Sequence, residues 1–219
     1  QTDMKRLIAF SSVAHMGFVM LGISTLTTLG IDAAIFGMVA HGLITGMLFF
    51  VAGSVKERYH TLQISRLSGM LKQMPRLGWI LGFCAMASLG LPGLAGFWGE
   101  FPAILSAYSP AGGLSLVLFR TLMVVAAVGT VLAASYLLWL YQRTAFGEPT
   151  AEFSGHGHAH AAGAAANDEH HDDIHDVTIF EWIAWTPMLI AIVVFGVYPQ
   201  LMFKVIDPAV DQLTAVFRK

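Results

Sequence analysis

Three side chains that can bind and release protons lie inside long apolar stretches of this sequence: His15, His41 and Glu100. An imidazole exchanges protons near neutral pH because its unperturbed pKa is about 6.5, and burial away from water favours the protonated form of a carboxyl group. Ionisable groups are costly in an apolar surrounding, so those that occur there commonly mark ion or proton pathways. The three residues therefore predict proton transfer. The alternative for each of them is a structural hydrogen bond between helices.

Polar neighbours accompany both histidines at helical spacing. Ser11 and Ser12 precede His15 by four and three residues, so the three side chains share one face of a helix. Thr45 follows His41 by one helical turn. These hydroxyl groups indicate a polar line along two neighbouring helices.

Glu100 follows a cluster of helix-breaking residues in the apolar run 77–108. As one helix that run would be about 48 Å long, whereas the apolar core of a bilayer is about 30 Å thick. Its centre reads GLPGLAGFWGE from Gly90, and Pro92 removes a backbone donor there. We therefore expect two half-helices joined by non-helical backbone within 89–96, in a wet or protein-lined cavity where such backbone is tolerated.

The composition is that of a membrane protein. Hydrophobic residues make up 56% of the chain, charged residues 12%, and the mean hydropathy is +0.66, whereas soluble domains carry about 25% charged residues. A net charge of −2 gives no reason to expect a nucleic-acid partner. The single cysteine, Cys84, excludes an internal disulfide and a cysteine metal cluster within these 219 residues.

These patterns predict an all-α polytopic membrane protein with about five transmembrane helices, one of them discontinuous. The expected spans are 4–26, 32–55, the broken 77–108, 114–140 and 180–203. We expect 60–75 at the membrane surface, with an interfacial helix as one option, and a terminal amphipathic helix at 207–219. The chain then divides into four spans at 1–147, a loop at 148–177, and the last span with its tail at 178–219.

The basic residues predict the orientation. Eight of the twelve lysines and arginines fall on the side of the N-terminus, and four on the other side: Arg120, Lys204, Arg218 and Lys219. The positive-inside rule places the N-terminal end in the cytoplasm and the C-terminus outside. The chain starts with Gln and an apolar span follows almost at once, so we expect the C-terminal portion of a longer protein.

The loop 148–176 is unlike the rest of the chain, because it contains GHGHAH at 155–160 and DEHHDD at 168–173. Low hydrophobicity and clustered like charges are typical of disorder. We interpret it as a solvated cytoplasmic linker; weak binding of Zn²⁺ or Ni²⁺ by its histidines is the alternative.

Several motifs resemble one known family. The first eighteen residues, QTDMKRLIAFSSVAHMGF, resemble a signature of the antiporter-like subunits of respiratory complex I. MVAHGL at 38–43, KERYHT at 56–61 and GLPG with GFWGEF at 90–101 resemble the subunit M branch of that family. The resemblance covers 1–146 and the last span, and leaves out the histidine-rich loop.

The resemblance implies a fold of two inverted repeats, of which this chain would hold the last five spans. It implies that Glu100 is the terminal proton carrier of the outward half-channel and that His15 and His41 lie on a central hydrophilic axis. Subunits L and N and the multisubunit Na⁺/H⁺ antiporters usually carry lysine where Glu100 stands, which favours the M branch. The glutamate and lysine of the first repeat, and the central lysine, belong to parts of the family that this sequence lacks.

Three functions remain open at this point. The favoured one is a proton-translocating subunit of NADH–quinone oxidoreductase in the inner or plasma membrane. Subunits L and N would be its neighbours, and NADH, FMN, iron–sulfur clusters and quinone would be bound by partner subunits rather than by this chain. The alternative is a subunit of a multisubunit Na⁺/H⁺ antiporter. The third is a membrane anchor without transport, for which loss of the Glu100 carboxylate would leave pumping intact.

Overall fold

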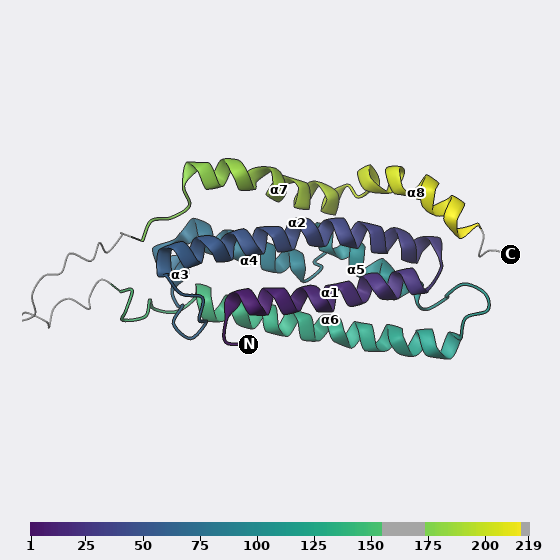
Figure 1. Ribbon diagram of the computed structural model, residues 1–219, viewed down its shortest axis with the longest axis horizontal. Coiled ribbons are helices and arrows are strands. Elements are labelled where there is room, and N and C mark those ends of the chain that lie inside the picture. The colour runs from purple at the N-terminus through teal and green to yellow at the C-terminus, as the bar shows by residue number, and fades with distance from the viewer. Residues whose placement is uncertain (155–173, 216–219) are drawn as a thin grey trace, which may run out of the picture.

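The computed structural model describes residues 1–154 and 174–215, and within them the regular structure is entirely α-helical. The helices are α1 (Met4–Ser24), α2 (Thr28–Tyr59), α3 (Met70–Gln73), α4 (Pro75–Ser88), α5 (Ala95–Ser106), α6 (Leu116–Ala145), α7 (Ile179–Val197) and α8 (Gln200–Thr214). Figure 1 shows α1, α2, α6 and α7 running along the longest axis of the molecule, with α4 and α5 following each other among them.

The prediction of five spans, one of them discontinuous, is confirmed. Helices α1, α2, α6 and α7 are long and apolar enough to cross a membrane. The remaining span, third in chain order, consists of α4 and α5, which are too short to cross separately: 14 and 12 residues correspond to about 21 and 18 Å. The chain is thus a multi-pass helical bundle.

The expected break lies where the glycines and the proline predicted it. Helix α4 ends at Ser88 and α5 begins at Ala95, so the backbone of 89–94 is non-helical. Gly90 and Gly93 have φ angles of 67° and 93°, a region that residues with a Cβ rarely adopt. The break therefore depends on glycine at these two positions.

Helix α2 forms the centre of the bundle and packs against α1, α4, α5, α7 and α8. Its contact with α5 is unusually close at Gly37, where an added Cβ would lie 3.3 Å from the Cα of Gly99. Phe36, Met47 and Leu48 on the same helix are fully buried. Glycine on both helices therefore allows backbone to touch backbone beside the helix break.

The prediction for the last span was partly wrong. Helix α7 ends at Val197 rather than at 203, and α8 begins at Gln200 rather than at 207. The physical reason is Pro199, because the residue before a proline avoids helical angles; Tyr198 has φ −127° and ψ 70°. The chain turns at this point and resumes as a second helix, whose Val210 is buried. The rest of the expected tail, 216–219, lies outside the described residues.

The interfacial helix considered for 60–75 is also wrong in extent, because the helical residues there are the four of α3 and Pro75, the first residue of α4. The remainder is a loop that pairs with the N-terminus: Met4 donates its N–H to the carbonyl of Leu62, and Ile64 donates to Thr2, both at 2.9 Å. Ile64 and Leu67 are buried. The segment therefore closes one end of the bundle.

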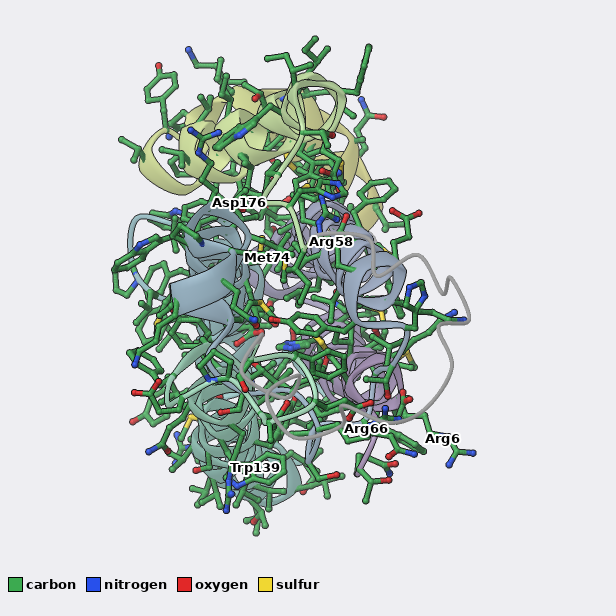
Figure 2. The ribbon with its side chains drawn as sticks, turned by 90° about the vertical axis from the view of Figure 1, so that its left-hand side faces the viewer. Arg6, Arg58, Arg66, Met74, Trp139 and Asp176 are labelled. Atoms are coloured by element: carbon green, nitrogen blue, oxygen red, sulfur yellow. The ribbon has the colours of Figure 1, made fainter. Side chains whose placement is uncertain are left out.

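A buried ion pair joins α7 to α2 at the same end. Arg58 Nη2 lies 2.7 Å from Glu181 Oε2 and Nη1 lies 3.1 Å from Oε1, while Ser54 donates to Oε1 at 2.5 Å. Arg58 also donates to the carbonyls of His175 and Asp176, and Figure 2 shows Arg58 and Asp176 close together where α7 meets the bundle. The pair fixes the start of the last span.

Asp176 caps helix α4 from a distant part of the chain. Its Oδ2 accepts the N–H of Arg76 at 2.9 Å, and its Oδ1 accepts the N–H groups of Leu77 and Val177 at 3.1 and 2.7 Å. Met74, the residue before α4, makes no side-chain cap of its own. The orphan N–H groups of the half-helix are therefore satisfied by the segment that leads into α7.

The division of the chain into 1–147, 148–177 and 178–219 stays a prediction.

Candidate proton-transfer site

His15 and Glu100 meet at the helix break. The Nδ1 atom of His15 on α1 lies 2.6 Å from Oε1 of Glu100 on α5, a short distance typical of a charge-assisted hydrogen bond. The side chains are 6% and 14% exposed. Since an ionised carboxylate only accepts, Nδ1 carries the proton in that state. A proton can therefore pass between the two groups without side-chain movement.

The second nitrogen of His15 faces the other half of the broken span. Its Nε2 lies 3.1 Å from Oγ of Ser88, the last residue of α4. When the ring is neutral with its proton on Nδ1, Nε2 accepts a hydrogen bond from the Ser88 hydroxyl; when the ring is protonated, Nε2 donates to that oxygen. His15 thus connects the end of α4 with Glu100 in the middle of α5, across the break.

His41 lies next to this pair on α2. The centroids of the His15 and His41 rings are 5.5 Å apart, and Thr45 Oγ1 lies 3.1 Å from Nδ1 of His41. His15, His41, Ser88 and Glu100 all line one cavity of about 20 Å³, which is room for about one water molecule. The two imidazoles therefore lie side by side at the edge of a cavity that has room for about one water.

Small residues create the room for this cavity. Gly37, Gly96 and Gly99 line it together with the polar groups. An added Cβ at Gly96 would collide with the carbonyl of Ala87, so glycine lets α5 start directly beside the end of α4. Glycines within α2 and α5 therefore provide the space for the cavity, directly beside the break that Gly90 and Gly93 form.

The three predicted site residues His15, His41 and Glu100 all lie together. Thr45 lies beside His41, as its spacing predicted. The hydroxyls of Ser11 and Ser12 differ from the expectation, because both donate to the carbonyl of Ile8 in their own helix. The hydrogen bonds that these two serines donate thus go to their own helix and not to the imidazole of His15 or His41.

Ser88 was missed by the sequence interpretation. A buried hydroxyl directly before a run of helix breakers is a signal that could have found it, because the end of a broken helix lies where the cavity opens. Its partner could not be found from the sequence, since Ser88 and His15 are 73 residues apart.

In the part of the chain that the structure describes, no group of three or more His, Cys, Asp or Glu side chains is arranged to hold a metal ion. The histidine-rich stretch that prompted the zinc or nickel alternative spans 155–173 and lies outside the described residues. Cys84 is a buried free thiol in α4, as expected for a packing residue.

Residues 1–139 match a family model described as "NADH:quinone oxidoreductase/Mrp antiporter, TM". NADH-quinone oxidoreductase subunit M of Rhodobacter capsulatus is 38% identical over 213 residues, which cover 97% of this chain and 37% of that protein. Subunit M of Rickettsia felis is 34% identical over 217 residues, covering 99% and 39%. NAD(P)H-quinone oxidoreductase chain 4 of Acaryochloris marina is 32% identical over 218 residues, covering 100% and 38%. The chain thus spans about two fifths of these relatives.

Two solved structures, from different kinds of complex, contain a chain with a similar arrangement of helices. A chain in respiratory complex I from Thermus thermophilus with bound NADH matches with a TM-score of 0.80 and 27% identity, covering 99% of this chain and 40% of that one. A chain in the Mrp complex from Dietzia sp. DQ12-45-1b matches with a TM-score of 0.71 and 20% identity, covering 97% and 42%. At 20% identity the second likeness concerns the fold alone.

Proposed function

Because the chain belongs to the transmembrane family of NADH:quinone oxidoreductases and Mrp antiporters, we propose that it translocates protons in the membrane arm of an NADH–quinone oxidoreductase. The observation that carries the proposal is the 2.6 Å contact between His15 and Glu100 at the break of the third span. A proton acceptor that is buried, hydrogen-bonded to an imidazole and placed beside a small cavity has the parts that a proton path needs.

In this proposal the proton arrives from the side of His41 and passes to His15 through the hydroxyl of Ser88. Ser88 gives its own proton to Nε2 and takes the arriving proton in its place. The doubly protonated ring then releases its Nδ1 proton to Oε1 of Glu100. The neutral ring is left with its proton on Nε2, so its tautomer must be exchanged before the next transfer.

Glu100 then releases its proton to the outer side of the membrane. The direction rests on the distribution of basic residues, which places the C-terminus outside and the histidine-rich loop in the cytoplasm. The half-channel that delivers protons to His41 would come from the parts of the longer protein that precede this chain.

The energy for transport would come from partner subunits. In an NADH–quinone oxidoreductase these bind NADH, FMN, iron–sulfur clusters and quinone, and subunits L and N would be the neighbours of this chain in the membrane arm. The role of this chain in the reaction is to hold and move protons between His15 and Glu100, and no redox step is assigned to its residues.

A cation/proton antiporter subunit is the alternative. Two observations favour the redox-driven pump. The relatives described above with 32–38% identity are all named as quinone oxidoreductase subunits, and position 100 is a glutamate, whereas the resemblance gives lysine for the antiporters. Purification of the full-length protein with NADH-oxidising partners, or with other antiporter subunits, separates the two.

The test is NADH-driven proton uptake into vesicles that contain the assembled complex. Glu100→Gln keeps the size and the hydrogen bonding of the side chain but cannot change charge, so proton uptake by this path should collapse while the subunits still co-purify. Glu100→Asp keeps a titratable group but withdraws it by one methylene, so uptake should fall only in part. Full uptake by an assembled Glu100→Gln complex would exclude the carrier role.

A further inference from the structure

An open apolar groove separates α4 from α7 on the outside of the bundle. Both helices pack against α2, and between them lies a space of about 590 Å³ lined by Trp79, Ile80 and Phe83 from α4 and by Trp182, Ile190 and Val193, among others, from α7. Nothing in the described part of the chain fills it. The groove is separate from the proton-transfer site and from the ion pair of Arg58 and Glu181.

The walls of the groove are open to the surroundings. Trp79 is 69% exposed and Ile190 is 55% exposed, and only Trp185, Ile192 and Gly196 of the 19 residues of α7 are buried. Both helices belong to membrane spans, so an apolar space between them is filled by acyl chains or by another polypeptide and not by water.

One end of the groove carries a positive charge. Arg76, in the first turn of α4, is the charged residue of the lining. Its backbone N–H is held by Asp176, but its guanidinium makes no hydrogen bond or ion pair with any described residue. Two other cations at this end of the bundle do form ion pairs: Lys72 with Glu148, and Arg58 with Glu181. Within the described residues, Arg76 therefore presents an unpaired positive charge at the mouth of the groove.

The dimensions of the groove match one leaflet of a bilayer. Along α7 the lining runs from Trp182 to Val194, which is about 18 Å of helix; half of a bilayer core is about 15 Å. Arg76 and Trp79 lie near the start of α4, at the level where arginine and tryptophan side chains meet lipid headgroups. The charge thus sits at headgroup depth and the apolar walls at acyl-chain depth.

We propose that the α4–α7 groove binds an anionic phospholipid of the leaflet at the Arg76 end, with its phosphate on the guanidinium of Arg76 and an acyl chain between Phe83 and Ile190. A guanidinium presents several N–H donors to a phosphate in a fixed fork. The positive-inside prediction makes this the cytoplasmic leaflet. The bound lipid fills the space between the two helices and thereby supports the position of α7 beside α4.

The experiment uses the assembled complex with the full-length subunit, in nanodiscs that contain equal amounts of phosphatidylglycerol and phosphatidylcholine. A photoreactive benzoylphenylalanine replaces Ile190, and mass spectrometry identifies what it captures. The expected product is a phospholipid adduct enriched in phosphatidylglycerol. Capture of a polypeptide, either an earlier segment of the same protein or a neighbouring subunit, would overturn the proposal.

Charge variants test the headgroup contact. Arg76→Gln should lower the ratio of captured phosphatidylglycerol to phosphatidylcholine several-fold, and Arg76→Lys should keep most of the enrichment. Arg143→Gln is the matched control, because Arg143 is an exposed arginine near Trp139 on α6 and does not line the groove. An unchanged ratio in Arg76→Gln, or an equal loss in Arg143→Gln, would contradict the assigned phosphate site.

Discussion

The carboxylate of Glu100 rests against the backbone of Gly90: a Cβ added at Gly90 would lie 3.0 Å from Glu100 Oε2. Because φ at Gly90 is +67°, the glycine serves two purposes. It allows the turn after α4, and it leaves room for the carboxylate that His15 contacts.

Gly90→Ala should therefore displace the Glu100 carboxylate and lower proton uptake several-fold in a complex that still assembles. Gly93→Ala is the matched control. Gly93 also has a positive φ, of 93°, but an added Cβ there meets no atom within 4 Å, so it introduces similar backbone strain without touching Glu100. Comparable uptake in the two variants would show that backbone strain, and not the carboxylate, is decisive.

Ser88→Ala should slow proton transfer, because Nε2 of His15 loses the hydroxyl that lies 3.1 Å away. Without the Ser88 hydroxyl as a donor to Nε2, the neutral His15 ring has less preference for carrying its proton on Nδ1. The tautomer that donates to Glu100 is therefore less strongly favoured. We expect a several-fold fall in NADH-driven uptake, with recovery in Ser88→Thr, which restores a hydroxyl.

The control for Ser88 is Ser106→Ala. Ser106 is also a buried serine of the broken span, but its hydroxyl donates to the carbonyl of Ala103 in its own helix. An equal loss in both variants would mean that Ser88 acts through packing. A shift in the pH profile of uptake that is confined to Ser88→Ala would support its part in proton transfer.

Glu181→Ala should destabilise the attachment of α7, since it leaves the guanidinium of Arg58 buried without its carboxylate; the Arg58 side chain is only 3% exposed. Removing one partner of a buried ion pair costs about 3–5 kcal/mol. Hydrogen exchange in α7 should become faster in the assembled complex.

Glu152→Ala provides the comparison for this ion pair. Its partner Arg66 and Glu152 itself are both about half exposed, and such surface pairs contribute about 0–1 kcal/mol. Similar exchange rates in α7 for the two variants would contradict the role given to the Arg58–Glu181 pair.

Deletion of 155–173 should leave assembly and proton uptake nearly unchanged, because the contacts described on both sides of this segment come from residues that remain. Lys72 pairs with Glu148 and Arg66 with Glu152 before it, and Asp176 caps α4 after it. A short glycine–serine linker replaces the segment. Loss of uptake at unchanged expression would reveal a binding role for the histidine-rich sequence.

Much of the fold and the three predicted site residues followed from simple physical signals in the sequence. Apolar length located the spans, and the clustered glycines with Pro92 located the break, because together these residues disfavour a helix. His15, His41 and Glu100 stood out because ionisable groups are rare in such surroundings. Each of these signals is local, so no knowledge of tertiary packing was needed.

The features that escaped prediction depend on contacts between distant segments. Ser88 looks like an ordinary hydroxyl of an apolar helix until α1 places His15 beside it. Arg58 and Glu181 are 123 residues apart, and their pairing requires α7 to return to α2. The end of the last span was misplaced because apolar residues continue past Pro199, so hydropathy does not record the turn there.

The backbone contact between Gly37 and Gly99 has a mechanical consequence. Because the two backbones lie in direct contact there, α2 and α5 pack closely over a long stretch, and we expect His41 and Glu100, which they carry, to keep a fixed separation. The non-helical 89–94 is then the compliant joint of the third span. Ser88 lies on the α4 side of this segment and Glu100 on the α5 side, so any displacement of α4 relative to α5 would change the Ser88–His15 contact while leaving Glu100 in place against α2.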